Sequence, residues 1–234
     1  MNAVKLQVKR GIFTKKRVKQ SEFDYFERIK SVLVKSKNLS KSLGARALFS
    51  ALSVDNGAGR PKLSIMKFEK IDPKSLNENS AKLIGSDWLL ICAGTPEKYN
   101  MMTASWGAFG FMWNAPSIFV FVRPTRYTYR FMEESKGFTI NVLPESRREA
   151  LRVCGSVSGR DCDKTALSGL TPAPAENGGV FFEEARLVFE CRKAYSQMMD
   201  ARSFEDKGFL EKWYADSNFH KMYVGIIESA YKSV

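Results

Sequence analysis

The sequence predicts a mainly β domain, an antiparallel barrel or sandwich with peripheral helices, over residues 66–234 of a 234-residue chain. Three observations predict this class. About six runs are rich in the β-branched and aromatic residues that suit a pleated, half-buried surface. The helical patterns between them do not alternate regularly with the strands, as a parallel sheet requires. Neither the glycine-rich dinucleotide fingerprint nor the phosphate-binding P-loop occurs in the sequence.

The expected strands are short apolar runs bounded by residues that favour turns. Their spacing along the chain favours an antiparallel arrangement in which helices lie at the periphery. Strands are expected at residues 87–93, 101–106, 117–122, 138–142, 185–196 and 222–231.

The expected helices are stretches where apolar residues recur at three- and four-residue spacing. Thr125, which follows a proline, is expected to cap one of them, and Asp161 or Asp163 another. Helices are expected at residues 77–84, 125–135, 145–154, 161–167 and 204–215.

The basic charge of the chain is concentrated in residues 1–65. This segment holds 15 Lys and Arg against 4 Asp and Glu, a net charge of +11, whereas the rest of the chain carries only +1. An argument for a nucleic-acid partner from total charge would therefore concern the first 65 residues alone. For the body of the protein we expect no nucleic-acid partner.

Three interpretations of residues 1–65 stay open. The one-signed charge favours a disordered extension, although residues 22–34 have a short helical pattern. The scarcity of acidic residues near the start also fits a transit-like or anionic-surface-binding segment. Finally, the sequence from Met66 onward is typical of the start of a domain. If translation begins at Met66, residues 1–65 are not made at all. We expect the first or the third interpretation.

Composition excludes several classes of protein. The longest apolar runs, residues 88–94 and 117–122, are far shorter than the roughly 18 residues that span a bilayer, so we expect no membrane partner. Four cysteines without C-x-x-C spacing predict reduced thiols and a cytoplasmic location. The single histidine, His220, argues against a histidine-based metal site or triad.

Two polar clusters carry candidate chemistry near the middle of the chain. Residues 100–107 pack small and hydroxylated residues between a methionine pair and Trp106, which suits a planar ligand with polar edges. They also fit an ordinary strand entering a glycine turn. Residues 122–129 join a strand end to a helix start, where orphan N–H groups favour an anion and Arg123 and Arg126 add charge. They also fit a capped helix with two solvated arginines.

A third polar cluster, residues 154–161, holds two glycines and two serines between expected helices. Such a loop can turn its N–H and OH groups inward as an anion-binding nest, with Arg160 and Lys164 supplying charge. It also fits a helix that ends at Gly155 and another that begins at Asp161.

Six segments, taken in order, form a set that is more specific than any one of them. They are Met-Thr-Ala-Ser-Trp-Gly (102–107), Trp-Asn-Ala-Pro (113–116), Val-Arg-Pro-Thr-Arg-Tyr-Thr (122–128), Cys-Gly-Ser-Val-Ser-Gly-Arg-Asp-Cys-Asp-Lys (154–164), Gly-Leu-Thr-Pro (169–172) and His-x-x-Tyr-Val-Gly (220–225). This ordered set resembles the flavin reductase-like family, whose members include flavoredoxin. The resemblance covers residues 66–234.

The resemblance implies a six-stranded, FMN-binding split β-barrel that works as a homodimer, with FMN near the subunit interface. It implies no catalytic side chain, because the flavin carries the chemistry. His220 is the one possible exception, as a residue close to the reacting atoms. The cofactor-binding residues that it implies are Met102, Thr103, Ala104, Ser105, Trp106, Arg123, Thr125, Tyr127, Thr128, Cys154, Ser156, Ser158, Gly159 and Lys164.

The activity that the resemblance implies is hydride transfer from NADH or NADPH to FMN. Two alternatives stay open. The protein would otherwise be a flavoredoxin-type electron carrier that a redox protein reduces, or a binding module that uses its basic N-terminal segment. Consumption of NADH or NADPH separates the first activity from the second.

Overall fold

The computed structural model describes three stretches of the chain, residues 4–9, 12–17 and 68–234. Contacts within the chain divide it into two units, residues 1–59 and 60–234. The two units are described separately, and the candidate site lies in the second.

In the first unit, β1 (Val4–Lys9) pairs antiparallel with β2 (Ile12–Arg17) as a hairpin. An isolated two-stranded hairpin is marginal in water, so this pairing alone does not make a stable domain. The helical pattern at 22–34 and the start at Met66 lie outside the described residues. The interpretations of the N-terminal segment therefore stay predictions.

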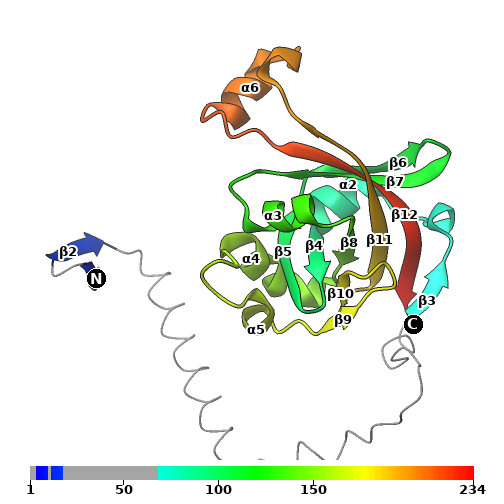
Figure 1. Cartoon of the computed structure of the whole chain (residues 1–234), viewed down its shortest axis with the longest axis horizontal. Coiled ribbons are helices and arrows are strands. Elements are labelled where there is room, and N and C mark those ends of the chain that lie inside the picture. Colours follow the sequence, from blue (N-terminus) through cyan, green and yellow to red (C-terminus); the bar gives the residue numbers. More distant parts are fainter. Residues whose placement is uncertain (1–3, 10–11, 18–67) are drawn as a thin grey trace, which may run out of the picture. The chain divides into compact units, whose positions relative to one another are not determined.

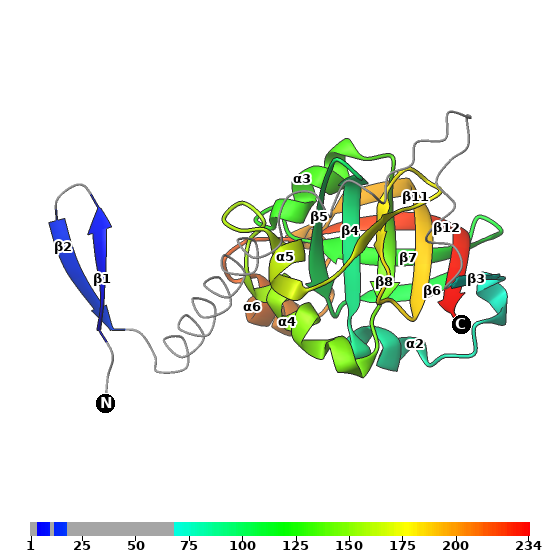
Figure 2. The same cartoon turned by 90° about the horizontal axis from the view of Figure 1, so that it is seen from below.

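One antiparallel sheet of eight strands forms the body of the second unit, in the order β5, β4, β8, β11, β12, β7 and β6, with β3 paired to β12. The sheet curves so that β4 and β5 face β6 and β7 across a core (Figures 1 and 2). The predicted class is confirmed, and β3 and β6 add two strands to the expected six. The strands are β3 (Phe68–Ile71), β4 (Leu89–Thr95), β5 (Lys98–Ala104), β6 (Gly107–Met112), β7 (Ala115–Val122), β8 (Gly137–Val142), β11 (Leu187–Met198) and β12 (Lys221–Ser233).

The strand β4 shows how the two-residue period of a strand builds two packed layers. Leu89 and Ile91 point into the curved sheet, where they belong to the same buried cluster as Val120 of β7. Leu90 points to the opposite face and belongs to a second cluster that includes Leu151 of a covering helix. Because both faces are covered, β4 is apolar throughout instead of alternating with polar residues.

Short helices and one hairpin complete the two layers. α3 (Tyr127–Glu134) and α4 (Arg148–Ser156) both contact β4 and β5, and α5 (Lys164–Ser168) packs against α4. The hairpin of β9 (Pro172–Pro174) and β10 (Val180–Phe182) packs beside β4 and β8. The remaining short elements are η2 (Pro73–Ser75), α2 (Ser80–Lys82), the π-helix η3 (Leu83–Asp87) and η4 (Glu145–Arg147).

The strands β11 and β12 are the longest in the sheet, and past the end of β8 they continue as a ribbon with β7 alongside β12 (Figure 1). Their far ends carry η5 (Ala201–Ser203) and α6 (Lys207–Tyr214). Residues 195–220 are called the arm below. Two shifts in the β11–β12 register increase the local bend of the ribbon toward the arm.

Two of the predicted helix ends are wrong. α3 begins one residue later than a Thr125 cap would place it, with Arg126 at the N-cap and no side chain bonded to the first turn. α4 does not end at Gly155 but continues through it to Ser156. The expected cap at Asp163 is confirmed, because its carboxylate accepts the N–H groups of Thr165 and Ala166 in α5.

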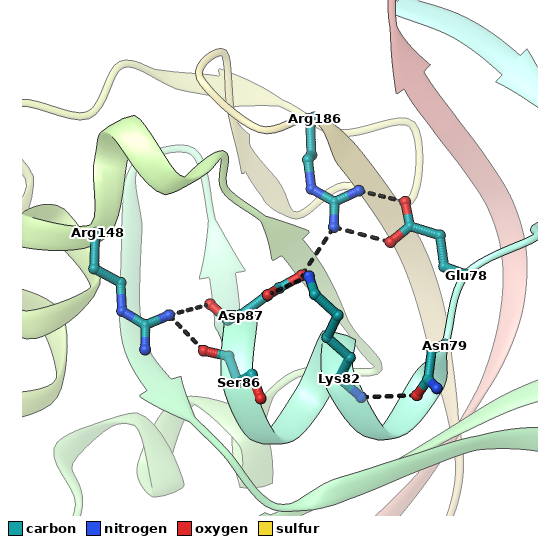
Figure 3. A network of polar contacts seen from close by, with 7 residues as sticks. All are labelled: Glu78, Asn79, Lys82, Ser86, Asp87, Arg148 and Arg186. Atoms are coloured by element: carbon teal, nitrogen blue, oxygen red, sulfur yellow. Dashed lines mark hydrogen bonds and ion pairs between the residues drawn. The ribbon is translucent and has the colours of Figure 1, made fainter.

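A polar clamp fixes the entry of β4 and β11 into the sheet (Figure 3). Arg186, just before β11, forms a two-pronged ion pair with Glu78 and reaches Asp87, 3.3 Å away and just before β4. Arg148 of α4 donates to the carbonyl of Asp87 (3.0 Å) and covers the Trp88 ring at 3.4 Å. Trp88 has a φ of 68°, which side chains seldom adopt, so these contacts hold a strained backbone in place.

Replacing Arg186 with methionine is expected to lower the free energy of unfolding by about 1–2 kcal/mol. The change keeps the apolar stem but leaves the partly buried carboxylate of Glu78 without its cation and Asp87 with Lys82 alone. Urea unfolding followed by tryptophan fluorescence measures the loss.

Arg192→Met, on β11 itself, is the matched control. Arg192 makes one exposed ion pair with Glu228, and such pairs contribute little, so we expect a loss below about 0.5 kcal/mol. Equal losses for the two variants would contradict the role given to the clamp.

Candidate functional site

The polar clusters that the sequence places in separate segments meet where β5, α3 and α4 come together. Asn100 of β5 donates through Nδ2 to the hydroxyl of Thr128 on α3, at 2.6 Å. Thr103 of β5 donates to the carbonyl of Leu151 on α4, at 2.5 Å. Asn100 and Thr128 are both buried, so this contact is made away from water and fixes the start of α3 against β5.

Lys164, at the start of α5, ties the same elements together from inside. Its side chain is 6% exposed, and its ammonium donates to the carbonyl of Met101 (2.9 Å) and to that of Cys154 (2.7 Å). Burial lowers the pKa of Lys164 and raises the pKa of the neighbouring Cys154 thiol. Two of the three ammonium donors therefore bind backbone, so Lys164 first of all joins β5 to α4.

Gly159 is required by a close approach between the 157–163 loop and β5. A Cβ atom at this position would lie 2.0 Å from Oδ1 of Asn100 and 3.2 Å from the ring of Tyr127. Since Asn100 is buried and bonded to Thr128, it cannot move aside freely. Glycine here lets the third cluster contact the first two.

Part of the 157–163 loop, which its sequence suggests as an anion-binding nest, uses its polar groups within the loop itself. The N–H groups of Arg160 and Asp161 bond within the loop, to the hydroxyl and the carbonyl of Ser158 respectively. The Cys162 thiol also bonds to the Ser158 carbonyl. These groups stabilise the turn itself, because a short loop between two helices must satisfy its own backbone.

Cationic groups gather instead at the start of α3. The first turn of this helix has no side-chain cap, which leaves N–H groups and the positive end of the helix dipole there. Arg126 donates to the carbonyl of Gly155 at 3.2 Å, and Arg160 to that of Thr125 at 3.3 Å. Each guanidinium keeps further donors, so the region suits a phosphate-like anion.

Arg123 connects this cationic region to the arm. It follows β7 directly and donates to the carbonyl of Trp213 in α6 at 2.8 Å. It also lies 3.8 Å from the carboxylate of Asp216 and 5.4 Å from the centre of the Tyr214 ring. The end of α6 is a favourable place for a cation because the helix dipole is negative there.

An aromatic wall stands beside these cations. The ring of Trp106, in the link between β5 and β6, lies 5.1 Å from that of Trp213 and 5.0 Å from that of His220. Trp106 and Trp213 are 37% and 41% exposed, which is high for indole rings that also pack on one another. The wall offers a flat apolar surface next to an anion site.

His220 is held neutral within this wall. Burial lowers its pKa to about 4, and the positive charges of Arg123 and Arg126 act in the same direction. The imidazole therefore carries one proton at neutral pH and can serve as a hydrogen-bond donor at one nitrogen only.

The other expected site residues take varied positions. Met102 and Ala104 are buried in the inner core, so they could meet a ligand only through their backbone. Ser105 and Ser156 are exposed, and the hydroxyl of Ser156 bonds to the carbonyl of Val153. Their roles toward a ligand stay predictions.

The cofactor-binding residues implied by the resemblance omit Asn100, which stands in the first polar cluster, and the arm residues Trp213, Tyr214 and Asn218. The helical pattern at 204–215 places Trp213 on an apolar stripe but does not indicate what that stripe contacts. In the structure this stripe contributes Trp213 to the wall, and Asn218 donates to the Thr125 hydroxyl at 3.2 Å. Spacing along one helix cannot show which distant loop the stripe will meet.

Within the described stretches, none of the helices has the length and apolar character needed to cross a bilayer. The same stretches contain no cluster of three or more His, Cys, Asp or Glu side chains arranged to hold a metal ion.

Several solved structures share the fold. The flavoredoxin of Methanosarcina acetivorans is 24% identical, with a TM-score of 0.50 over 63% of this chain and 68% of that one. An FMN-binding domain of a flavin reductase-like enzyme from Shewanella baltica is 15% identical, with a TM-score of 0.51 over 71% and 77%. An FMN-binding protein from Thermus thermophilus, with bound p-hydroxybenzaldehyde, is 16% identical, with a TM-score of 0.50 over 78% and 82%. At these identities the likeness concerns the fold.

No protein of curated function matches the sequence. The sequence model of one family, the flavin reductase like domain, matches residues 82–229. The matched segment runs from α2 to β12 and includes the three polar clusters, the arm and His220. Because this match covers more than half of the chain, the protein belongs to the flavin reductase like domain family.

Proposed function

We propose that the protein is an FMN-binding oxidoreductase that takes hydride from NADH or NADPH. One observation carries the proposal: the uncapped start of α3, with Arg126 and Arg160 beside it, is joined through the Asn218–Thr125 hydrogen bond to the arm that forms the aromatic wall with Trp106. A phosphate and a flat ring joined by a short polar chain match this pair of features. Family membership supports the same ligand.

The residues at the site fit FMN by the chemistry of their donors. Arg126, Arg160 and the first N–H groups of α3 would bind the phosphate, and the Thr125 hydroxyl lies within the same region. Thr103, Ser105 and Trp106 would border the ring. FMN, when bound, supplies the two-electron redox chemistry, so no side chain need act as a nucleophile. The protein would orient the ring and place donors where negative charge develops.

The arm would restrict access to the same ring. Trp213 packs on Trp106, and Arg123 holds the end of α6 in place from the neighbouring loop. A wall of this kind excludes water from one side of a bound ring and strengthens the electrostatic contacts there. The expected homodimer, the cytoplasmic location and the choice between NADH and NADPH stay predictions.

The first test is the visible absorption spectrum of the purified protein with FMN, recorded without air before and after addition of NADH or NADPH. We expect flavin bands that bleach with one of the two nucleotides. Bands that persist with both would support a flavoredoxin-type carrier reduced by a protein. Failure to bind FMN at all would overturn the proposal.

A second test separates the phosphate site from the ring site. Arg126→Met is expected to weaken FMN binding by about 1.5–3 kcal/mol, because a charge-assisted bond to phosphate is lost. Arg123→Ala is expected to have an effect in the same range. Riboflavin, which has the ring but no phosphate, should bind the wild type and Arg126→Met equally well.

Arg130→Met is the control for that comparison. Arg130 lies on α3 but pairs with Glu134 on the exposed side of the helix, so its removal should leave FMN affinity unchanged. Fluorescence titration of both ligands measures the affinities. An Arg126→Met variant that binds FMN like the wild type would remove the start of α3 from the site.

A third test concerns the close approach at Gly159. Gly159→Ala should lower the unfolding free energy by about 1–3 kcal/mol and weaken FMN binding, since its Cβ would displace Asn100 or the loop. Gly85→Ala is the control, because nothing lies within 4 Å of its added Cβ. If both variants bound FMN like the wild type, the 157–163 loop would have no part in the site.

A further inference from the structure

The single histidine of the chain is held from three directions. The His220 ring packs on Trp106 with centroids 5.0 Å apart, and its backbone carbonyl accepts the N–H of Met199 at 2.9 Å. On the third side, the hydroxyl of Tyr214 lies 2.9 Å from Nδ1 of the imidazole. The position and the tilt of the ring are therefore fixed by the arm and by the β5–β6 link together.

Tyr214 is itself rigidly placed. It is 5% exposed, and its ring stacks on that of Phe219 with centroids 5.1 Å apart and an angle of 13° between them. Arg123 lies over the same ring and bonds to the preceding residue, Trp213. Because the ring cannot turn freely, the direction of its hydroxyl toward His220 is set by the packing of the arm.

The position of the hydroxyl proton follows from the two acceptors near it. The Tyr214 hydroxyl lies 2.9 Å from Nδ1 and 3.4 Å from the sulfur of Met199. An imidazole nitrogen is a much stronger acceptor than a thioether, so the hydroxyl donates to Nδ1. Arg123 and Arg126 face His220 and keep it neutral, while the carboxylate of Asp216 pairs with Arg123.

A neutral imidazole whose Nδ1 accepts a hydrogen bond must carry its proton on Nε2. Among the described residues no hydrogen bond from this Nε2 to another protein group is found. The nitrogen belongs to a ring that packs against Trp106, which we have placed beside the flavin. A ligand in that site would therefore meet an N–H donor.

We propose that Tyr214 is a positioning residue that holds His220 in the neutral tautomer protonated on Nε2, so that Nε2–H donates to a carbonyl oxygen of a ligand lying against Trp106. The inference rests on the proposed function. In the other tautomer Nε2 would present a lone pair, which repels a carbonyl oxygen. The oxygen would belong either to the pyrimidine part of the flavin or to the carboxamide of the nicotinamide.

The tautomer is tested on the full chain without any ligand. Because the chain has one histidine, ¹⁵N labelling of histidine gives a single pair of ring signals. We expect the wild type to show a protonated Nε2 and an unprotonated Nδ1 at neutral pH. Tyr214→Phe, which keeps the ring stacking but removes the hydroxyl, should show a mixture of the two tautomers.

Tyr195→Phe is the matched control for this measurement. Tyr195 also lies on the arm, but its hydroxyl bonds to Gln197, so its removal should leave the histidine signals unchanged. Thermal unfolding of each variant verifies that the arm is intact. A wild type protonated on Nδ1, or a Tyr214→Phe spectrum identical to that of the wild type, would overturn the proposal.

The ligand is identified by binding and kinetics with the same three proteins. Loss of one neutral hydrogen bond weakens the affected interaction by a few-fold to about tenfold. A higher FMN dissociation constant in Tyr214→Phe assigns the oxygen to the flavin. A higher KM for the nicotinamide donor, with FMN affinity and kcat unchanged, assigns it to the carboxamide.

No change in either constant would refute the carbonyl contact even if the tautomer were as expected. A wild type that binds no FMN would instead overturn the proposed function and the ligand assignment with it. The histidine spectra would still decide whether Tyr214 sets the tautomer, so the two failures are distinguishable.

Discussion

The pairing of β11 with β12 is the constraint on which the rest of the structure depends. These strands lie in the middle of the sheet and continue past the end of β8, so one ladder of hydrogen bonds supports both the core and the arm. At Gly225, opposite Lys193, a Cβ atom would lie 2.6 Å from the ring of Phe138 and 2.9 Å from Cys191. Only glycine permits that approach, next to the register shift that follows the end of the β11–β8 pairing.

The consequence of this ribbon is that residues far apart in sequence meet at one place. Trp106 follows β5 near one end of the sheet order, whereas Trp213 and His220 come from the arm between β11 and β12. The contact between them needs the ribbon to bend over the end of β7, where Arg123 holds it. The aromatic wall is therefore a product of sheet topology as much as of local sequence.

Much of the fold could be predicted from the sequence because its central strands are strongly patterned. β4 begins as a continuous apolar run, which is the pattern of a strand covered on both faces, and β7 is apolar apart from Ser117. β8 alternates apolar residues with the buried polar residues Thr139 and Asn141. β6 was missed because its glycine and alanine residues resemble a turn, and its strand state comes from pairing with β7.

The candidate site was predictable only in part, for a related reason. Arg123, Thr103 and Gly159 stand in segments whose composition suggests ligand chemistry. Asn100 and Tyr214 act through contacts with residues distant in sequence, at Thr128 and His220. A tyrosine on the apolar stripe of a short helix looks like a core residue, and Tyr214 is indeed buried. The role of its hydroxyl can be inferred only from the fold, which places it beside His220.

Arg123 shows why the two halves of the site cannot be considered separately. Its guanidinium bonds to the carbonyl of Trp213 and lies near Asp216, so its charge already has partners on the arm. The same charge helps to keep His220 neutral. An anion bound at the start of α3 would compete with the exposed Asp216 for this cation, while the bond to Trp213 has a neutral carbonyl as its acceptor and is directional. The site can therefore accept a phosphate without releasing the arm, because the bond that positions α6 does not depend on an opposite charge.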